Sequence, residues 1–232
     1  MRRLILALGA VALVSGFIVP TVASAQQSVN LYVGGFTVRS EDARGTDDVL
    51  FQDANFLAFR LKDFNGPTAG GEYLVGVMPY LEAGLGVGIY SRSVPSVYRD
   101  FVNSDGSEIE QSLKLRVVPF TATIRFLPLG NNGGFKPYIG AGVGIFAWRY
   151  SETGQFVDFT DNSIFRDTFV GRGTSVGPVI LGGVTVPIGA IGVGGEIRYQ
   201  SAKGDLPASE GFAGSRIDLG GMNYLFIVNL RF

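Results

Sequence analysis

The sequence predicts an all-β protein, an eight-stranded antiparallel up-and-down β-barrel that crosses a membrane. Apolar and polar residues alternate along many short segments, which is typical of strands with one face in lipid. Compact turns alternate with long polar connections, as they do in such barrels. The chain contains 34 glycines, which favour short strands and turns over helices.

The first 25 residues have the pattern of a secretory signal peptide. Arg2 and Arg3 precede an apolar run over 4–19, and Ala23-Ser24-Ala25 resembles a cleavage site. The apolar run is shorter than the ~20 residues that a spanning helix needs. We therefore expect residues 1–25 to be removed and residues 26–232 to form one outer-membrane barrel domain.

Eight segments are predicted as strands, namely 29–38, 71–78, 81–92, 111–126, 138–148, 175–186, 191–200 and the end of 217–232. The segment 81–92 alternates most clearly, since every odd residue from Leu81 to Ile89 is apolar. The terminal segment carries an apolar or aromatic residue at every second position from Met222 to Phe232. These apolar faces are the ones we expect to meet lipid.

The segment 111–126 changes phase. Leu113, Leu115 and Val117 are apolar in one phase, whereas the apolar residues from Phe120 to Phe126 follow the other. We expect a β-bulge over 117–119, next to Pro119, to restore the facing of the strand.

The connections fall into two classes. Those at 79–80, 127–137 and 187–190 are compact, whereas 39–70, 93–110, 150–174 and 201–216 are long and polar. Within the first long connection, 48–64 is too apolar for an ordinary loop. We interpret it as a short helix against the barrel, and the alternative is an additional strand pair that gives ten strands.

The charged residues on the predicted strands provide a test of the barrel, because they should all lie on the inner face. An Arg or Lys on the lipid face at the midplane costs ~2–4 kcal/mol, so these charges should point into the lumen and pair there. The predicted lumen charges are Glu72, Glu82, Lys114, Arg116, Arg125, Glu196, Arg198 and Arg231. Glu196 with Arg231 is one pair that the strand order allows.

The lumen has two interpretations. It is either a gated polar path or a packed polar core, and the glycines on the inner faces either keep a channel open or make room for large neighbours. We favour the packed core, because eight strands leave an interior that side chains nearly fill.

The composition weakens the case for catalysis. The chain has no His and no Cys, so it lacks the residues of a histidine-dependent nucleophile, an imidazole or thiolate metal site, or a disulfide. We expect no cofactor. Asp158, Asp161 and Asp167 lie in the third long connection, where we interpret them as solvated loop charges, with weak cation binding left open. The net charge of −1 gives no sign of a nucleic-acid partner.

The strand-and-loop rhythm, the segment KPYIGAGVGIF at 136–146 and the terminal Phe232 resemble the small eight-stranded outer-membrane proteins of Gram-negative envelopes. Examples are the transmembrane domain of outer-membrane protein A and the outer-membrane protein W group. The resemblance implies a location in the outer membrane, contact with its lipid, and recognition of the terminal strand, with Phe232, by the barrel-assembly machinery.

The resemblance implies little about activity. Three functions remain, and we rank them in this order. The first is a non-enzymatic barrel that contributes to the envelope and presents surface loops. The second is a narrow, porin-like channel for small or hydrophobic solutes, and the third is an outer-membrane enzyme.

Overall fold

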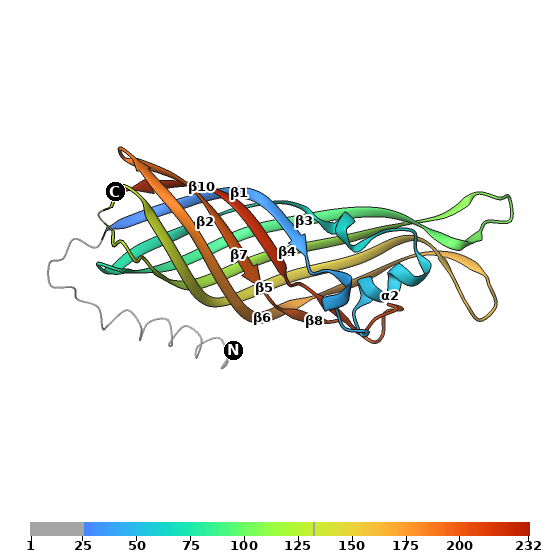
Figure 1. Cartoon of the computed structure of the whole chain (residues 1–232). Coiled ribbons are helices and arrows are strands. Elements are labelled where there is room, and N and C mark those ends of the chain that lie inside the picture. The colour runs from blue at the N-terminus through green and yellow to red at the C-terminus, as the bar shows by residue number, and fades with distance from the viewer. Residues whose placement is uncertain (1–25, 132) are drawn as a thin grey trace.

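The computed structural model describes residues 26–131 and 133–232, so the predicted signal peptide at 1–25 lies outside the described residues. Eight antiparallel strands close into a barrel, and β1 completes the ring by pairing with β10 (Figure 1). The strands of the ring are β1 (Gln27–Val38), β2 (Gly66–Met78), β3 (Leu81–Val102), β4 (Glu108–Phe126), β5 (Lys136–Val157), β6 (Ile164–Ile188), β7 (Ile191–Gln200) and β10 (Gly221–Arg231). The predicted eight-stranded barrel is confirmed.

The remaining elements lie in two of the long connections. The first holds the 3-10 helices η1 (Glu41–Ala43) and η2 (Leu61–Phe64) and the α-helix α2 (Val49–Phe56), and the last holds the small pair β8 (Lys203–Asp205) and β9 (Arg216–Asp218). The short helix expected within 48–64 is therefore confirmed, and the ten-strand alternative is wrong. In the described part of the chain, no helix has the length and apolar character needed to cross a membrane.

A side-chain cap explains where α2 begins. The carboxylate of Asp48 accepts a hydrogen bond from the backbone N–H of Phe51 at 3.1 Å, which satisfies one of the free N–H groups of the first turn. The same carboxylate accepts from the N–H of Asp218 at 2.6 Å, and it pairs with Arg44 at 2.8 Å. Asp48 thus ties the first long connection to the last one.

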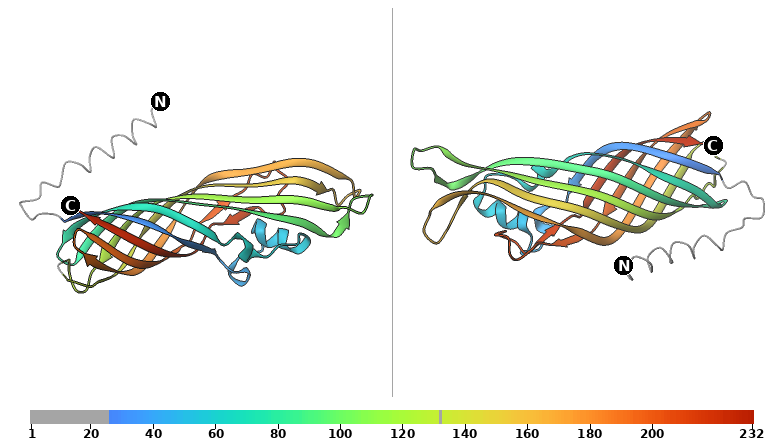
Figure 2. Two further views of the ribbon diagram at one scale, coloured as in Figure 1. Left: turned by 90° about the horizontal axis from the view of Figure 1, so that it is seen from above. Right: turned by 180° about the vertical axis from the view of Figure 1, so that it is seen from behind.

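Strands β3 to β6 extend far beyond the other four (Figure 2). β5 has 22 residues, which at ~3.3 Å per residue span about 70 Å, more than twice the ~30 Å of a hydrocarbon core. The predicted connections 93–110 and 150–174 are therefore too long. The observed strands leave only 103–107 and 158–163 between them. Polar residues on the outer face of the extended strands make these segments look like loops in the sequence.

The predicted β-bulge over 117–119 is also wrong. β4 keeps one register with β3 from Phe126 opposite Leu81 to Glu110 opposite Val97, and one register with β5 throughout. Odd residues of β4 point inward along its whole length, so Leu115 and Thr123 share the inner face. The change of phase in the sequence reflects a change of surroundings on both faces of the strand.

The surroundings change where the barrel leaves the membrane. In the part near the short turns, the outside of the wall is apolar and the lumen is polar. In the extended part, the outside is polar and the inner face packs against α2, η2 and the segment 201–220 to form an apolar core. That core includes Leu50, Leu57, Phe64, Leu113, Leu115, Trp148, Tyr150 and Ile217.

Candidate functional site

An apolar band surrounds the barrel from its short turns to a sharp boundary. Outward-facing residues in this band are apolar, aromatic or small, and the exposed ones include Leu31, Tyr73, Leu85, Phe120, Ile139, Ile180, Ile197 and Phe226. A closed antiparallel barrel with such a band is the form in which strands cross the outer membrane. The protein is therefore an outer-membrane β-barrel, and its short turns face the periplasm.

A row of arginines forms the outer boundary of the band. Arg116, Arg149 and Arg172 pair directly across β4, β5 and β6, and all three are exposed on the outer face. The outward residues next to them toward the turns are the apolar Val118 of β4, the apolar Ala147 of β5 and the small polar Thr174 of β6. Everything beyond this row lies outside the membrane-spanning part.

Four buried charges form a closed ring across the lumen. Arg125 of β4 contacts Glu72 of β2 and lies 2.9 Å from Glu196 of β7. Arg198 of β7 lies 2.7 Å from Glu196 and 3.3 Å from Glu72. The side chains are at most 6% exposed, and two cations balance two anions. The pairing offsets the large cost of burying each charge.

Neighbouring polar and aromatic groups complete the ring. Thr123 donates its hydroxyl to Glu72 at 3.0 Å, and Tyr138 donates to Glu196 at 2.9 Å. The guanidinium of Arg125 lies 4.6 Å from the ring centroid of Tyr138. These contacts fix the carboxylates and fill the cross-section of the lumen.

The inner glycines make room for these side chains. A Cβ at Gly84 would lie 2.7 Å from both Glu72 Oε1 and Thr123 Oγ1, and one at Gly183 would lie 2.6 Å from the hydroxyl of Tyr138. The polar core is therefore packed at this level. At this level of the barrel, the inner glycines do not leave a wide open channel.

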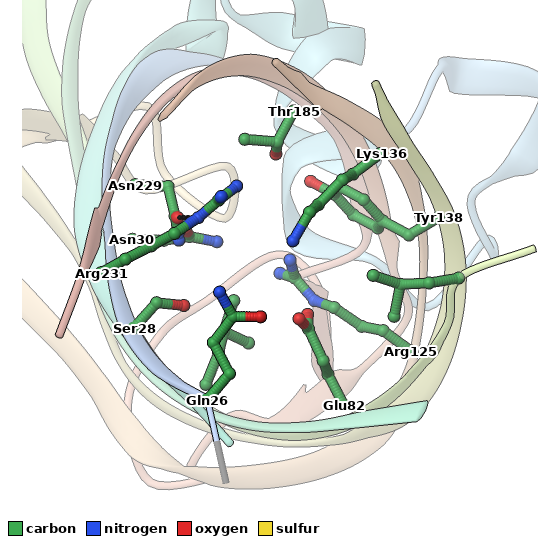
Figure 3. A pocket seen from close by; sticks show the side chains of 12 residues that line it. Gln26, Ser28, Asn30, Glu82, Arg125, Lys136, Tyr138, Thr185, Asn229 and Arg231 are labelled. Carbon is green, nitrogen blue, oxygen red and sulfur yellow. Dashed lines mark hydrogen bonds between the residues drawn. The ribbon is translucent and has the colours of Figure 1, made fainter. Parts of the chain in front are cut away.

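The periplasmic mouth of the lumen ends at this ring. Figure 3 shows Glu82, Arg125, Lys136 and Arg231 projecting from the wall into the mouth. The cavity among them measures about 20 Å³, which is room for about one water molecule. Lys136 is a lumen charge that the sequence did not reveal, because it lies in the predicted turn 127–137.

The structure divides the predicted lumen charges into three groups. Glu72, Arg125, Glu196 and Arg198 form the ring, and Glu82 and Arg231 lie at the mouth. Lys114 and Arg116 were wrongly assigned, because they lie on the outer face of β4, Arg116 at the edge of the apolar band and Lys114 beyond it. The sequence analysis placed both residues on the inner face because it assumed a β-bulge, and β4 has no such bulge.

The pair of Glu196 with Arg231 is wrong as well. Glu196 lies opposite Leu225 in the middle of the barrel, whereas Arg231 ends β10 at the mouth. The Nε of Arg231 instead donates to Asn229 Oδ1 at 3.1 Å.

Two carboxyl groups are buried in the extended part, outside the membrane. Asp53 of α2 is 0% exposed, and Glu152 of β5 is 4% exposed. Asp53 accepts a hydrogen bond from the hydroxyl of Tyr150 at 2.9 Å. Burial raises the pKa of Asp53 well above its usual range, with a further contribution from the neighbouring Glu152, and burial raises the pKa of Glu152 from 4.5 to about 7.

The carboxylates of the β5–β6 tip are exposed, as expected for loop charges. Asp158, Asp161 and Asp167 accept hydrogen bonds from the backbone N–H groups of Thr160, Ser163 and Thr168 at 2.7–2.9 Å. They shape the turn at the end of the hairpin. Asn162 has a φ of 58° there, which Asn tolerates better than most residues.

The fold is similar to those of several small outer-membrane barrels. Neisserial surface protein A shares 13% identity, with a TM-score of 0.48, over 91% of this chain and 100% of that one. Outer Membrane Protein W of E. coli shares 15%, with a TM-score of 0.42, over 91% and 100%. The N-terminal β-barrel domain of Pseudomonas aeruginosa OprF shares 12%, with a TM-score of 0.42, over 90% and 100%. These likenesses concern the fold alone. No protein-family model matches the sequence, and no curated protein matches it.

Proposed function

We propose that this protein is a non-enzymatic barrel of the envelope, which holds a compact assembly of strands and loops on the outer surface. The charge ring of Arg125, Glu72, Arg198 and Glu196 carries this proposal, because it closes the lumen at mid-depth. The apolar core above it, which includes Leu113, Leu115 and Trp148, closes the outer end. A barrel whose lumen is closed at two levels anchors the outer assembly in the membrane, and it offers no path for solutes.

The composition of the chain supports the non-enzymatic role. The chain has no His and no Cys. Within residues 26–131 and 133–232, no three or more Asp, Glu, His or Cys side chains gather where they could hold a metal ion.

Single-channel recording in planar bilayers tests the proposal. We expect the wild-type barrel to show no steady conductance, and we expect Glu196→Gln to show brief openings, because Arg125 and Arg198 then lose a shared anion. Asp158→Asn, which alters only an exposed charge at the hairpin tip, should stay silent. A steady wild-type conductance would favour the alternative function, a narrow channel for small solutes.

Lipid of the outer leaflet is the first partner that we propose. Arg116, Arg149 and Arg172 lie side by side at the edge of the apolar band, and within the described residues none of them makes an ion pair. Like charges directly opposite one another repel, so the row favours an anion against it. Phosphate-bearing lipid headgroups supply that anion at this depth.

The barrel-assembly machinery is the second partner that we propose. Phe232 follows β10 directly, and its side chain is 72% exposed at the periplasmic end of the lipid-facing surface. Its backbone N–H donates to the carbonyl of Gln27 at 3.2 Å, so the residue still pairs with β1. An aromatic side chain at this position is accessible to the assembly machinery while β10 pairs with β1.

A further inference from the structure

A cavity opens at the outer end of the molecule, away from the membrane. It measures about 500 Å³ and lies between α2, β3, β5, β6 and the tip of the β5–β6 hairpin. Phe56 stacks on Tyr98 with ring centroids 5.7 Å apart, and Phe156 meets Phe169 edge to face at 4.6 Å. The aromatic side chains of the lining are Phe56, Tyr98, Phe156, Phe159, Phe165 and Phe169. Such walls suit apolar groups and also attract cations to the ring faces.

Three acceptor oxygens in the same cavity have no hydrogen-bond partner among the described residues. They are Oδ1 of Asp53, Oε1 of Gln111 and Oε1 of Glu152, on side chains from residues that are 0%, 4% and 4% exposed. Buried acceptors are almost always satisfied, and an unsatisfied one is costly. In the described part of the chain, Oε1 of Gln111 has no donor in any state, whereas Oδ1 of Asp53 and Oε1 of Glu152 are bridged by a proton when one of the two carboxyls is protonated. With both carboxyls ionised, all three oxygens need a donor from outside the described residues.

The orientation of Gln111 is fixed by its own contacts. Its Nε2 donates to the hydroxyl of Tyr98 at 3.1 Å and to the carbonyl of Gln155 at 3.0 Å. Rotating the amide would lose the bond to the carbonyl of Gln155, because an amide oxygen cannot donate, so Oε1 stays an acceptor.

Among the described residues, no cation pairs with either of the two carboxyl groups. None of the ion pairs in the described residues involves Asp53 or Glu152. The other titratable groups that face them are Tyr150 of β5, Tyr98 of β3, Asp48 at the start of α2 and Asp158 at the mouth of the cavity. Asp48 is already paired with Arg44, and the segment 201–220 contributes only Gly211 and Ala213 to the lining.

We propose that this cavity binds a primary amine that carries an apolar or aromatic group. An ammonium group has three N–H donors and no acceptor, which matches the three unpartnered oxygens of Asp53, Gln111 and Glu152. The apolar part of the ligand lies against the aromatic walls. A metal ion such as Ca²⁺ fits less well, because it needs about six to eight oxygen ligands and the walls offer aromatic rings in place of further oxygens.

Binding of the amine competes with a proton. Burial raises the pKa of Glu152 to about 7 and that of Asp53 well above its usual range, so a protonated carboxyl is favoured in the empty cavity as the pH falls below about 7. An ammonium group displaces this proton when it pairs with both carboxylates. Affinity therefore rises as the pH is raised through about 7.

Calorimetric titration of the mature full chain in nonionic maltoside micelles tests the site. The probe is 2-phenylethylamine, and 2-phenylethanol is the neutral control of similar shape. We expect the amine to bind at least about tenfold more tightly than the alcohol, because only the amine makes charge-assisted bonds. We also expect the amine to release protons on binding and to bind more tightly at pH 8 than at pH 6.

Two variants separate binding from folding. Glu152→Gln and Asp53→Asn each remove one of two mutually repelling buried carboxyls, so they should fold at least as stably as the wild type and still bind the amine at least about tenfold more weakly. Asp161→Asn, at an exposed position outside the cavity, is the matched control and should bind as the wild type does. Equal affinity for the amine and the alcohol, no binding of the amine, or unchanged binding by Glu152→Gln would each overturn the proposal.

Discussion

Arg125 is the side chain on which the polar lumen depends most. Its side chain is 1% exposed, and it contacts the carboxylates of both Glu72 and Glu196, which come from opposite parts of the wall. Removing it leaves two buried anions with only Arg198 between them. Loss of one partner from a buried ion pair typically costs more than the pair contributes, because the other charge stays buried.

We expect Arg125→Gln to lower the free energy of unfolding of the barrel by about 3–5 kcal/mol. Urea titration of the protein in lipid vesicles, followed by circular dichroism, measures this loss. Arg116→Gln is the matched control, since it makes the same change on the same strand but on the exposed outer face. Equal losses in the two variants would mean that the ring around Arg125 contributes nothing to stability.

The buried carboxyls predict a dependence on pH. A carboxyl group whose pKa is raised in the folded state stabilises the fold fully below its ordinary pKa, and that stabilisation is lost as the pH rises through the folded value. For Glu152 this window runs from 4.5 to about 7. We expect the thermal midpoint of the outer assembly, followed by Trp148 fluorescence, to fall between pH 5 and pH 8. Glu152→Gln should flatten this profile, and an unchanged profile in the variant would assign the effect to other groups.

At the scale of elements, β4 shows how one strand serves two environments. Its inner face is polar at Thr121, Thr123 and Arg125, and apolar at Leu113 and Leu115, without any break in register. The outer face of β4 changes in the opposite sense, from apolar near the short turns to polar in the extended part. A strand can do this because its alternation fixes the two faces, whereas the medium on each side fixes the polarity that each face needs.

The segment 201–220 covers the inner face of the extended strands through a close contact at Gly204. A Cβ there would lie 2.3 Å from the indole ring of Trp148, whose Nε1 donates to Ser175 Oγ at 3.1 Å. We expect Gly204→Ala to destabilise the outer assembly by about 1–3 kcal/mol by overpacking.

The measurement is the emission of Trp148, the only tryptophan, which should shift to longer wavelength while the β-structure of the barrel persists. Gly134→Ala is the matched control, because a Cβ at Gly134 meets nothing within 4 Å. If the indole stayed as buried in Gly204→Ala as in the wild type, the segment would be packed more loosely than this contact implies.

At the scale of the whole molecule, we propose that the arginine row meets lipid headgroups at the edge of the apolar band. We expect the triple variant Arg116→Gln, Arg149→Gln and Arg172→Gln to lose its preference for vesicles with phosphate-rich anionic lipid, because the row then carries no charge. Co-sedimentation with anionic and neutral vesicles measures the preference.

The control carries three exposed changes farther from the lipid, at Arg60, Lys62 and Arg166. A lipid preference lost equally in both triple variants would show that net charge, and not the row, attracts the lipid.

The proposed role of Phe232 concerns assembly of the whole barrel. We expect deletion of Phe232 to reduce the amount of folded protein in the outer membrane, because the machinery then lacks the terminal aromatic group. Heat-modifiability of membrane fractions on gels measures folded protein. Phe135→Ala, at an exposed aromatic residue within the 127–137 connection, is the control. Wild-type levels after removal of Phe232 would contradict its role.

The sequence by itself determined the strand number, the facing of most strands and the class of the fold. These properties follow from local alternation and from turn residues, which a strand carries in its own sequence. Glu72, Glu196 and Arg198 were placed correctly for this reason. The helix within 48–64 was one of two interpretations of its apolar pattern, and only the structure excluded the additional strand pair.

Only the tertiary structure decided where the membrane ends and which side chains meet. The polarity of a strand face depends on the medium beyond it. Lys114 and Arg116 were therefore predicted as lumen residues, because the sequence does not show where along β4 the lipid ends. The pairing of Arg125 with Glu196 depends on barrel closure and shear, which no single strand encodes. Asp53, Gln111 and Glu152 come from three separate elements, and they form a site only because the extended strands fold over α2.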